Sequence, residues 1–142
     1  YTSSPNASTS MTCDGALGCA LYVQDAGSAA FPGLYMSASP TYLIKSPDTA
    51  FSATATLAAN VDGYGIQATT TAAGTGGTLT ITPRYLQNVN TVGGLATTTI
   101  ILASSTAAVT DKEVVVTYKA AAGVNALGGS YTDTVTFSCV SN

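Results

Sequence analysis

The stretch Phe51-Ser52-Ala53-Thr54-Ala55-Thr56-Leu57 alternates apolar and polar side chains from end to end. Successive side chains of a β-strand point to opposite faces, so a period of two is typical of a strand with one buried face. Asn60-Val61-Asp62-Gly63 then supplies turn residues, and the alternation resumes over residues 64–70. We therefore expect residues 51–57 and 64–70 to form a β-hairpin.

Segments of the same kind recur along the chain. Short apolar or alternating runs, with turn residues between them, cover residues 19–24, 31–36, 78–82, 97–103, 113–119 and 131–137. The glycine cluster at residues 74–77 lacks the lysine of a phosphate-binding loop and is expected to be a hairpin connection. No stretch combines a helical stripe with caps. About six to eight short strands at this spacing predict an all-β protein and a β-sandwich.

The length of 142 residues fits one domain. Residues 1–12 are rich in Ser and Thr, contain Pro5 and show little periodicity. We expect them to be an extended N-terminal arm, followed by a single sandwich domain over residues 13–142.

The composition argues against most catalytic functions. Charged residues make up 8% of the chain, the net charge is -3, and there is no histidine. So few cations disfavour nucleic-acid binding, and the missing histidine removes the usual general base and the commonest metal ligand. Asp48 and Asp62 lack the run of neighbouring carboxylates that a calcium loop needs. We predict a protein that is not an enzyme and has no cofactor or metal.

The cysteines and the apolar runs bear on the compartment. Of the three cysteines, Cys13 and Cys19 flank a turn with two glycines, and we favour a local bridge between them over a bridge from either one to Cys139. No apolar run approaches the roughly 20 residues that span a bilayer. The chain begins at Tyr1 without a basic region and apolar segment, so we expect a secreted protein whose signal has been removed. Asn6 begins a glycosylation sequon.

The segment Gly129-Ser130-Tyr131-Thr132-Asp133-Thr134-Val135-Thr136-Phe137 resembles the closing strand of secreted bacterial pilin-type sandwiches, especially spore coat protein U and chaperone–usher fimbrial subunits. In that group a Gly-x-Tyr-x-Asp pattern opens the last strand. Residues 51–57 and 64–70 are similar to the paired strands near the middle of those subunits. The usual cysteine pair of the group joins its first two strands, and the cysteine positions here depart from its pattern. The resemblance implies an incomplete immunoglobulin-like sandwich, completed by an extension from a neighbouring subunit.

These features predict a structural subunit of an extracellular pilus or fibre that polymerises with copies of itself through exchange of an extended β-strand. We expect the N-terminal arm to be the exchanged segment, because residues 129–139 are needed to close their own sandwich. The predicted subunit-contact residues are Tyr1, Thr2, Ser3, Ser4, Pro5, Ser8, Thr9, Ser10, Met11 and Thr12. The alternative is a monomeric cell-surface adhesin or stalk module whose loops, such as residues 88–94, contact a glycan or a protein partner.

Two smaller groups of residues have competing interpretations. The charged run Asp111-Lys112-Glu113 is expected to be a solvated turn before Val114. The alternative is an intramolecular isopeptide bond, for which the candidate amines are Lys45, Lys112 and Lys119. The tyrosines in strand patterns are expected in the core or at subunit contacts; they are Tyr22, Tyr64, Tyr118 and Tyr131.

Overall fold

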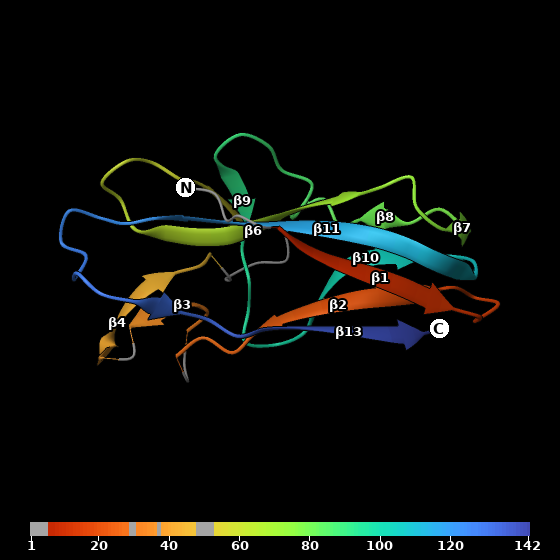
Figure 1. Cartoon of the computed structure of the whole chain (residues 1–142), viewed down its shortest axis with the longest axis horizontal. Coiled ribbons are helices and arrows are strands. Elements are labelled where there is room, and N and C mark those ends of the chain that lie inside the picture. The colour runs from red at the N-terminus through yellow and green to blue at the C-terminus, as the bar shows by residue number, and fades with distance from the viewer. Residues whose placement is uncertain (1–5, 29–30, 37, 48–52) are drawn as a thin grey trace.

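The protein consists of two β-sheets packed face to face and a third, smaller sheet at one end (Figure 1). The computed structural model describes residues 6–28, 31–36, 38–47 and 53–142. The described residues form thirteen strands and no helix, so the prediction of an all-β protein is confirmed. All pairings between these strands are antiparallel.

The larger sheet has the strand order β1-β11-β6-β9-β5, and the short strand β7 also pairs with β11. Its strands are β1 (Ala7–Cys13), β5 (Thr54–Thr56), β6 (Gly63–Thr70), β7 (Thr75–Gly76), β9 (Thr91–Gly93) and β11 (Val109–Ala121). The longest of them, β11, pairs with β1 along one side and with β6 along the other. Strand β1 is therefore an edge of this sheet.

The facing sheet has the order β13-β2-β10-β8, and the small sheet has the order β12-β3-β4. The strands of the facing sheet are β2 (Cys19–Asp25), β8 (Thr80–Ile81), β10 (Ile100–Ser105) and β13 (Val135–Ser141). Those of the small sheet are β3 (Gly33–Met36), β4 (Ser39–Lys45) and β12 (Tyr131–Thr132). Strand β13 is an edge of its sheet, and the chain ends beside it, at the end of the molecule far from the small sheet (Figure 1).

The hydrophobic core lies between the two larger sheets. Strand β11 contributes Val114 and Val116, which are fully buried, and β2 contributes Leu21 and Val23 from the opposite side. Both pairs follow the period of two that turns alternate side chains of a strand inward. Each such side chain stabilises the fold by about 1.5–3 kcal/mol relative to an exposed one.

The predicted hairpin between residues 51–57 and 64–70 is wrong. Phe51 and Ser52 lie outside the described residues, and the described strand β5 pairs with β9, which separates it from β6. Gly65 explains how β9 approaches β6 so closely, because a Cβ at this position would lie 2.7 Å from Cγ2 of Val92. The alternating pattern identified strands correctly but did not identify their partners.

Two other connections also differ from expectation. Residues 74–77 do not join a hairpin, because β6 lies in the larger sheet and β8 in the facing one, while β7 between them pairs with Val109 and Thr110. The run at residues 131–137 divides into β12, in the small sheet, and β13, in the facing sheet. The turn predicted around Asn60 is present, with Asn60 at a φ of 66°. Within the described residues, no helix is long and apolar enough to cross a membrane.

Candidate functional site

The N-terminal segment that we expected to be a free arm is largely a strand of its own sheet. Residues 7–12 belong to β1, which pairs with β11 from Ala7 opposite Val116 to Cys13 opposite Val109. Met11 is 1% exposed and belongs to the core. The apolar side of this strand consists of few and small side chains, which is why the sequence pattern did not reveal it.

The remaining N-terminal predictions divide between described and undescribed residues. Tyr1, Thr2, Ser3, Ser4 and Pro5 lie outside the described residues. Asn6, the expected glycosylation site, is exposed. Of the other predicted contact residues, Ser8, Ser10 and Thr12 are exposed, Thr9 is half-buried and Met11 is buried. Residues 7–12, which we expected in the arm, are therefore part of the larger sheet.

Side chains fasten β1 to the larger sheet. The hydroxyl of Ser8 donates to one oxygen of Glu113, and the hydroxyl of Thr71 donates to the other at 2.8 Å. These two hydrogen bonds lower the pKa of Glu113. At the other end of β1, the hydroxyl of Thr12 accepts a 2.9 Å hydrogen bond from the backbone N–H of Asp111. The run Asp111-Lys112-Glu113 is thus part of β11 opposite β1, and not the expected turn.

A disulfide joins Cys13 to Cys19, with 6.4 Å between their Cα atoms. It connects the last residue of β1 with the first residue of β2, and so links the two large sheets. Gly18 closes the intervening turn with a φ of 87° and an N–H that donates to the carbonyl of Gly15 at 2.9 Å. The third cysteine, Cys139, is free and exposed on β13, and partial burial raises the pKa of its thiol.

The outer edge of β13 presents a row of unpaired backbone groups. The N–H of Ala26 donates to the carbonyl of Thr134, and the N–H of Asn142 donates to the carbonyl of Gly18. Both pairs share the register that runs along β13 and β2. Because bonded pairs alternate in an antiparallel ladder, the even-numbered residues of β13 bond to β2. The N–H and C=O groups of the odd-numbered residues point away from the sheet; these residues are Val135, Phe137, Cys139 and Ser141.

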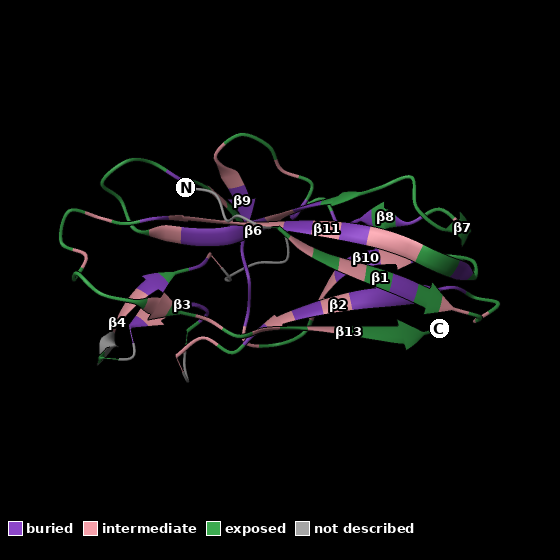
Figure 2. Cartoon of the chain, viewed as in Figure 1, coloured by how far each residue is buried: buried purple, intermediate pink, exposed green. Residues whose placement is uncertain are grey.

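The side chains of β13 are mostly exposed, whereas β2 beside it is mostly buried (Figure 2). Val135 and Phe137 pack against the core, and the last four residues of the strand are all exposed. Val140 is 49% exposed. The strand contains no charged residue. These features make β13 an open edge, which is the kind of surface that pairs with another strand.

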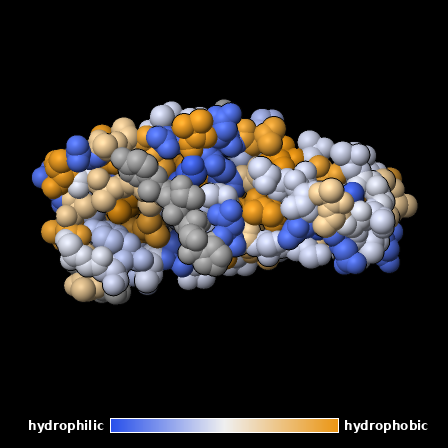
Figure 3. All heavy atoms as spheres, turned by 45° about the horizontal axis from the view of Figure 1, so that its top comes forward, coloured by the Kyte–Doolittle hydropathy of each residue, from blue (hydrophilic) through white to orange (hydrophobic). Residues whose placement is uncertain are grey.

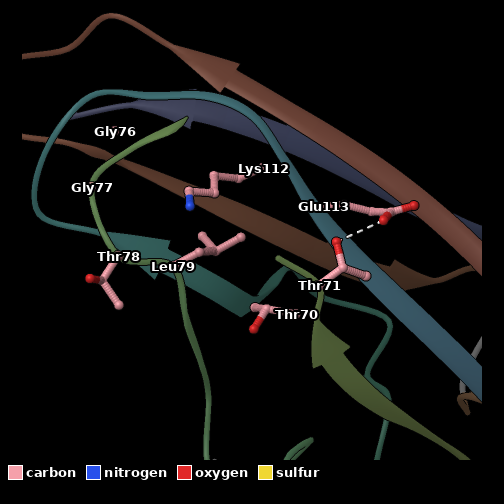
Figure 4. A pocket seen from close by; sticks show the side chains of 8 residues that line it. All are labelled: Thr70, Thr71, Gly76, Gly77, Thr78, Leu79, Lys112 and Glu113. Carbon is pink, nitrogen blue, oxygen red and sulfur yellow. Dashed lines mark hydrogen bonds between the residues drawn. The ribbon is translucent and has the colours of Figure 1, made fainter. Parts of the chain in front are cut away.

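A cavity of about 160 Å³ lies among three parts of the chain (Figure 4). These are the end of β6, β11, and the glycines Gly76 and Gly77 at the end of β7. Lys112 extends into it near Leu79, while Glu113 turns to the other side of β11 and bonds to Thr71. The carboxylate is thus already occupied by hydroxyl donors, and the other polar groups of the lining are the amine of Lys112, threonine side chains and backbone. The lining contains no base positioned to activate a nucleophile, so this arrangement does not resemble a catalytic site.

The loop between β8 and β9 exposes two apolar side chains. Leu86 is 63% exposed and Val89 is 75% exposed. Val89 has a φ of 50°, which is unusual for a β-branched residue, and its carbonyl accepts hydrogen bonds from Gln67 and Lys119. The loop expected over residues 88–94 ends at Asn90, because residues 91–93 form β9. On the face drawn in Figure 3, hydrophobic residues form separate patches with hydrophilic ones between them.

The structure places the three candidate amines of an isopeptide bond in separate surroundings. The Lys45 nitrogen lies 4.3 Å from the centroid of the Phe31 ring, Lys119 donates to the Val89 carbonyl, and Lys112 extends into the cavity. None of these contacts joins an amine to a buried carboxyl group.

Three of the four strand tyrosines lie in or beside the core, as expected. Tyr64 is buried, Tyr118 and Tyr131 pack against the core from half-buried positions, and Tyr22 is half-buried. The ring of Tyr131 meets that of Tyr42 edge to face, with 6.0 Å between centroids. This contact is part of the small sheet, where Tyr131 belongs to β12 and Tyr42 to β4.

Sequence reasoning missed a pair of acids, one buried and one half-buried. Asp25, the last residue of β2, is fully buried, and its pKa responds to the carboxyl group of Asp133. Asp133 also accepts a 2.8 Å hydrogen bond from the hydroxyl of Tyr64. In the sequence, Asp25 follows the run at residues 19–24 and precedes Ala26 and Gly27, a context that is typical of a turn. The available signal was that Asp133 stands at a fixed place in the Gly-x-Tyr-x-Asp pattern.

Comparison with protein-family models, curated proteins and solved structures finds no significant match to this chain.

Proposed function

We propose that the protein is a structural subunit of an extracellular pilus or fibre, which polymerises through β-strand pairing between neighbouring subunits. The observation that carries this proposal is the open edge of β13. Four of its residues direct backbone N–H and C=O groups outward, and an added strand satisfies these groups in a continuous ladder.

The composition of the edge strands supports the proposal. Monomeric β proteins commonly protect their edges with lysine, proline or inward-pointing charges. Strand β13, Val135–Ser141, has no charged residue and no proline, and neither has β1, Ala7–Cys13. Both are seven residues long, which exceeds the very short edge strands that discourage pairing. The chain thus lacks the usual protection at two of its edges.

Two features agree with the resemblance to pilin-type sandwiches. The cysteine positions in the sequence depart from the pattern of that group, but in the structure the bridge Cys13–Cys19 joins the first two strands of the chain, as the usual pair of the group does. The residues of the Gly-x-Tyr-x-Asp pattern each have a specific contact. A Cβ on Gly129 would lie 2.5 Å from Cε of Met36, the hydroxyl of Tyr131 donates to the carbonyl of Leu127, and Asp133 accepts from Tyr64.

An extracellular location is part of the proposal. Disulfides persist in oxidising compartments and are rare where thiols are kept reduced, which favours secretion for a chain with a Cys13–Cys19 bridge. The low proportion of charged side chains, 8%, points in the same direction.

A proline at an outward-facing position tests the proposed edge. In Cys139→Pro, the lost N–H points away from β2, so the home ladder keeps its hydrogen bonds while an incoming strand loses one. We expect filaments of the wild-type protein in negative-stain electron microscopy, and monomers of Cys139→Pro with an unchanged circular dichroism spectrum. Wild-type protein that stays monomeric at high concentration would refute the proposal, as would filaments of normal length from Cys139→Pro.

Two further variants separate related explanations. Cys139→Ser removes the thiol and keeps the N–H, so it is expected to form filaments; loss of assembly in this variant would mean that a disulfide between subunits makes the contact. Deleting residues 1–5 leaves β1 and Met11 in place. Loss of filaments in that variant would assign the donated segment to those residues, whereas normal filaments would assign it elsewhere.

The second candidate function, a cell-surface adhesin, is favoured by one feature, the loop that carries Leu86 and Val89. Two exposed apolar side chains on a loop held in an uncommon backbone conformation are typical of a contact surface. Under this alternative, Leu86→Ser/Val89→Ser abolishes binding of the monomer to a protein partner or glycan surface and leaves its melting temperature unchanged. Filament formation that is unaffected by this double variant would favour the fibre.

A further inference from the structure

Two carboxyl groups meet where the chain passes from the small sheet into the facing sheet. Asp25 ends β2, and Asp133 lies in the two-residue connection between β12 and β13. Asp25 is directly opposite Val135, the first residue of β13. Two backbone N–H groups form hydrogen bonds here. The N–H of Asp25 donates to the carbonyl of Ala96, and the N–H of Ala26 donates to the carbonyl of Thr134, each at 2.9 Å.

The side chains at this junction have unsatisfied oxygens if both acids are ionised. Asp25 is 0% exposed, and neither of its carboxyl oxygens accepts a well-formed hydrogen bond. Oδ1 of Asp133 is also buried without a partner, while Oδ2 accepts the hydrogen bond from Tyr64. Burying a carboxylate without a donor or counter-ion is strongly unfavourable. The folded protein therefore needs a proton, a hydrogen-bond donor or a counter-ion at this site, because two ionised carboxylates would be too unfavourable.

Among the described residues, no lysine or arginine acts on the pKa of Asp25. The groups that face the pair are the hydroxyl of Tyr64 from β6 and that of Tyr118 from β11. Both are neutral because burial raises their pKa, with a further contribution from Asp133 at both and from Asp25 at Tyr64. In the part of the chain that the structure describes, neither carboxyl forms an ion pair. The N–H groups of Gly27 and Gly33 favour the charged form of Asp25 but offset only part of the burial and of the repulsion by Asp133.

One proton shared between Asp25 and Asp133 removes the repulsion between the two carboxyl groups. When one acid is protonated, its O–H donates to the other carboxylate, and the pair carries one negative charge instead of two. Two like charges this close cannot both ionise at neutral pH, so the proton is held by the pair. The hydroxyl of Tyr64 then donates to the same unit through Asp133.

We propose that Asp25 and Asp133 form a proton-operated lock, in which one shared proton fastens the start of β13 to the end of β2 and its loss at alkaline pH loosens this junction. The lock belongs to the folded subunit and does not depend on the proposed assembly. It determines how firmly the open edge strand and the small sheet are attached to the rest of the domain.

The sign of the pH effect follows from the proton count. Burial, with the contribution of Asp133, raises the pKa of Asp25 to about 8, whereas in an unfolded chain an aspartate has a pKa of about 3.9. Between these values the folded protein holds one proton more than the unfolded chain. The stability contribution is therefore fully present below pH of about 4 and is lost as the pH rises to about 8. The unfolding equilibrium constant should increase by up to about tenfold per pH unit across this window.

Urea unfolding at a series of pH values from 4 to 9 tests the lock. We expect the unfolding constant of the wild-type protein to rise with pH across the window, and that of Asp25→Asn to change much less, because an amide donates to Asp133 without titrating. Asp14→Asn, which alters an exposed acid on the turn between the two cysteines, is the matched control and should retain the wild-type dependence. Equal pH dependence in wild type and Asp25→Asn would overturn the proposal.

A direct titration keeps the proposal testable if Asp25→Asn does not fold. In wild-type protein, the carboxyl carbon resonance of Asp25 should titrate near pH 8, several pH units above the ordinary value of an aspartate, and the amide resonance of Ala26 should shift over the same range. Titration of Asp25 near pH 4 would overturn the lock. So would a rise in wild-type melting temperature at pH 8 on addition of calcium chloride, because the pair would then hold a cation and not a proton.

Discussion

Strands β1 and β13 are both uncharged, seven-residue edges, yet the fold attaches them differently. Strand β1 is held by a buried methionine, by side-chain bonds at each end and by the disulfide that follows it. Along β13, only Val135 and Phe137 reach the core, and its other side chains are exposed. The backbone ladder with β2 provides most of its attachment.

This difference separates two functions that an edge strand can have. A strand that is fixed by side chains stays in its own domain, because all of those contacts must break together before it can leave. A strand that is held mainly by backbone hydrogen bonds to one neighbour has N–H and C=O groups on its other side that can bond to a second strand. The comparison therefore assigns β1 to stability and β13 to the proposed pairing between subunits.

The largest effect that distinguishes the two edges is expected from truncating Met11. Met11→Ala removes a buried side chain of the core and should destabilise the protein by about 2 to 5 kcal/mol. The matched truncation on the other edge, Val140→Ala, removes atoms from a residue that is 49% exposed and should have an effect below about 1 kcal/mol. Urea unfolding of both variants measures the difference. Similar losses of stability in the two variants would show that side chains hold β1 and β13 equally firmly, contrary to the comparison.

The next effect concerns the bridge that follows β1. Cys13 and Cys19 are six residues apart, and closing so short a loop should stabilise the fold by about 2 kcal/mol in the chain-entropy account. We expect reduction with dithiothreitol to lower the unfolding free energy by this amount in a Cys139→Ser variant. In this variant Cys13 and Cys19 are the two remaining cysteines, so the change reports on their bridge. A Cys13→Ala/Cys19→Ala variant that does not respond to dithiothreitol is the control. Unchanged stability on reduction would show that β1 is held by its other contacts alone.

The two edges also show how far the sequence predicts this molecule. Alternation over residues 64–70 and the apolar run at residues 113–119 predicted strands that the structure contains, because one buried face leaves its period in the sequence. Alternation does not specify a partner, so β9 between β5 and β6 was not foreseen. The pattern of β1 was also too weak, since Ser, Thr and Ala dominate it and a single methionine supplies the buried anchor.

The candidate site was less predictable than the fold. Whether a strand is an edge depends on the order of all strands in its sheet, which no local pattern contains. The open side of β13 became evident only from its register with β2. The pairing of Asp25 with Asp133 likewise joins residues that are distant in the sequence and close in the fold. By contrast, the Cys13–Cys19 bridge was within reach of the sequence because its loop is short and contains two glycines.

The smallest expected effect comes from the side-chain bonds at the start of β1. Hydroxyl donors from Ser8 and Thr71 lower the pKa of Glu113 from its ordinary value of 4.5, so the folded state holds fewer protons than the unfolded chain just below that pH. The resulting stability is present above pH of about 4.5 and is lost as the pH falls, opposite in sign to the effect of Asp25. Glu113→Gln should therefore lower the melting temperature slightly at pH 6, and this difference from wild type should shrink at pH 3. Asp14→Asn should show no such convergence. A difference for Glu113→Gln that is the same at both pH values would mean that the charge of Glu113 does not help to hold β1.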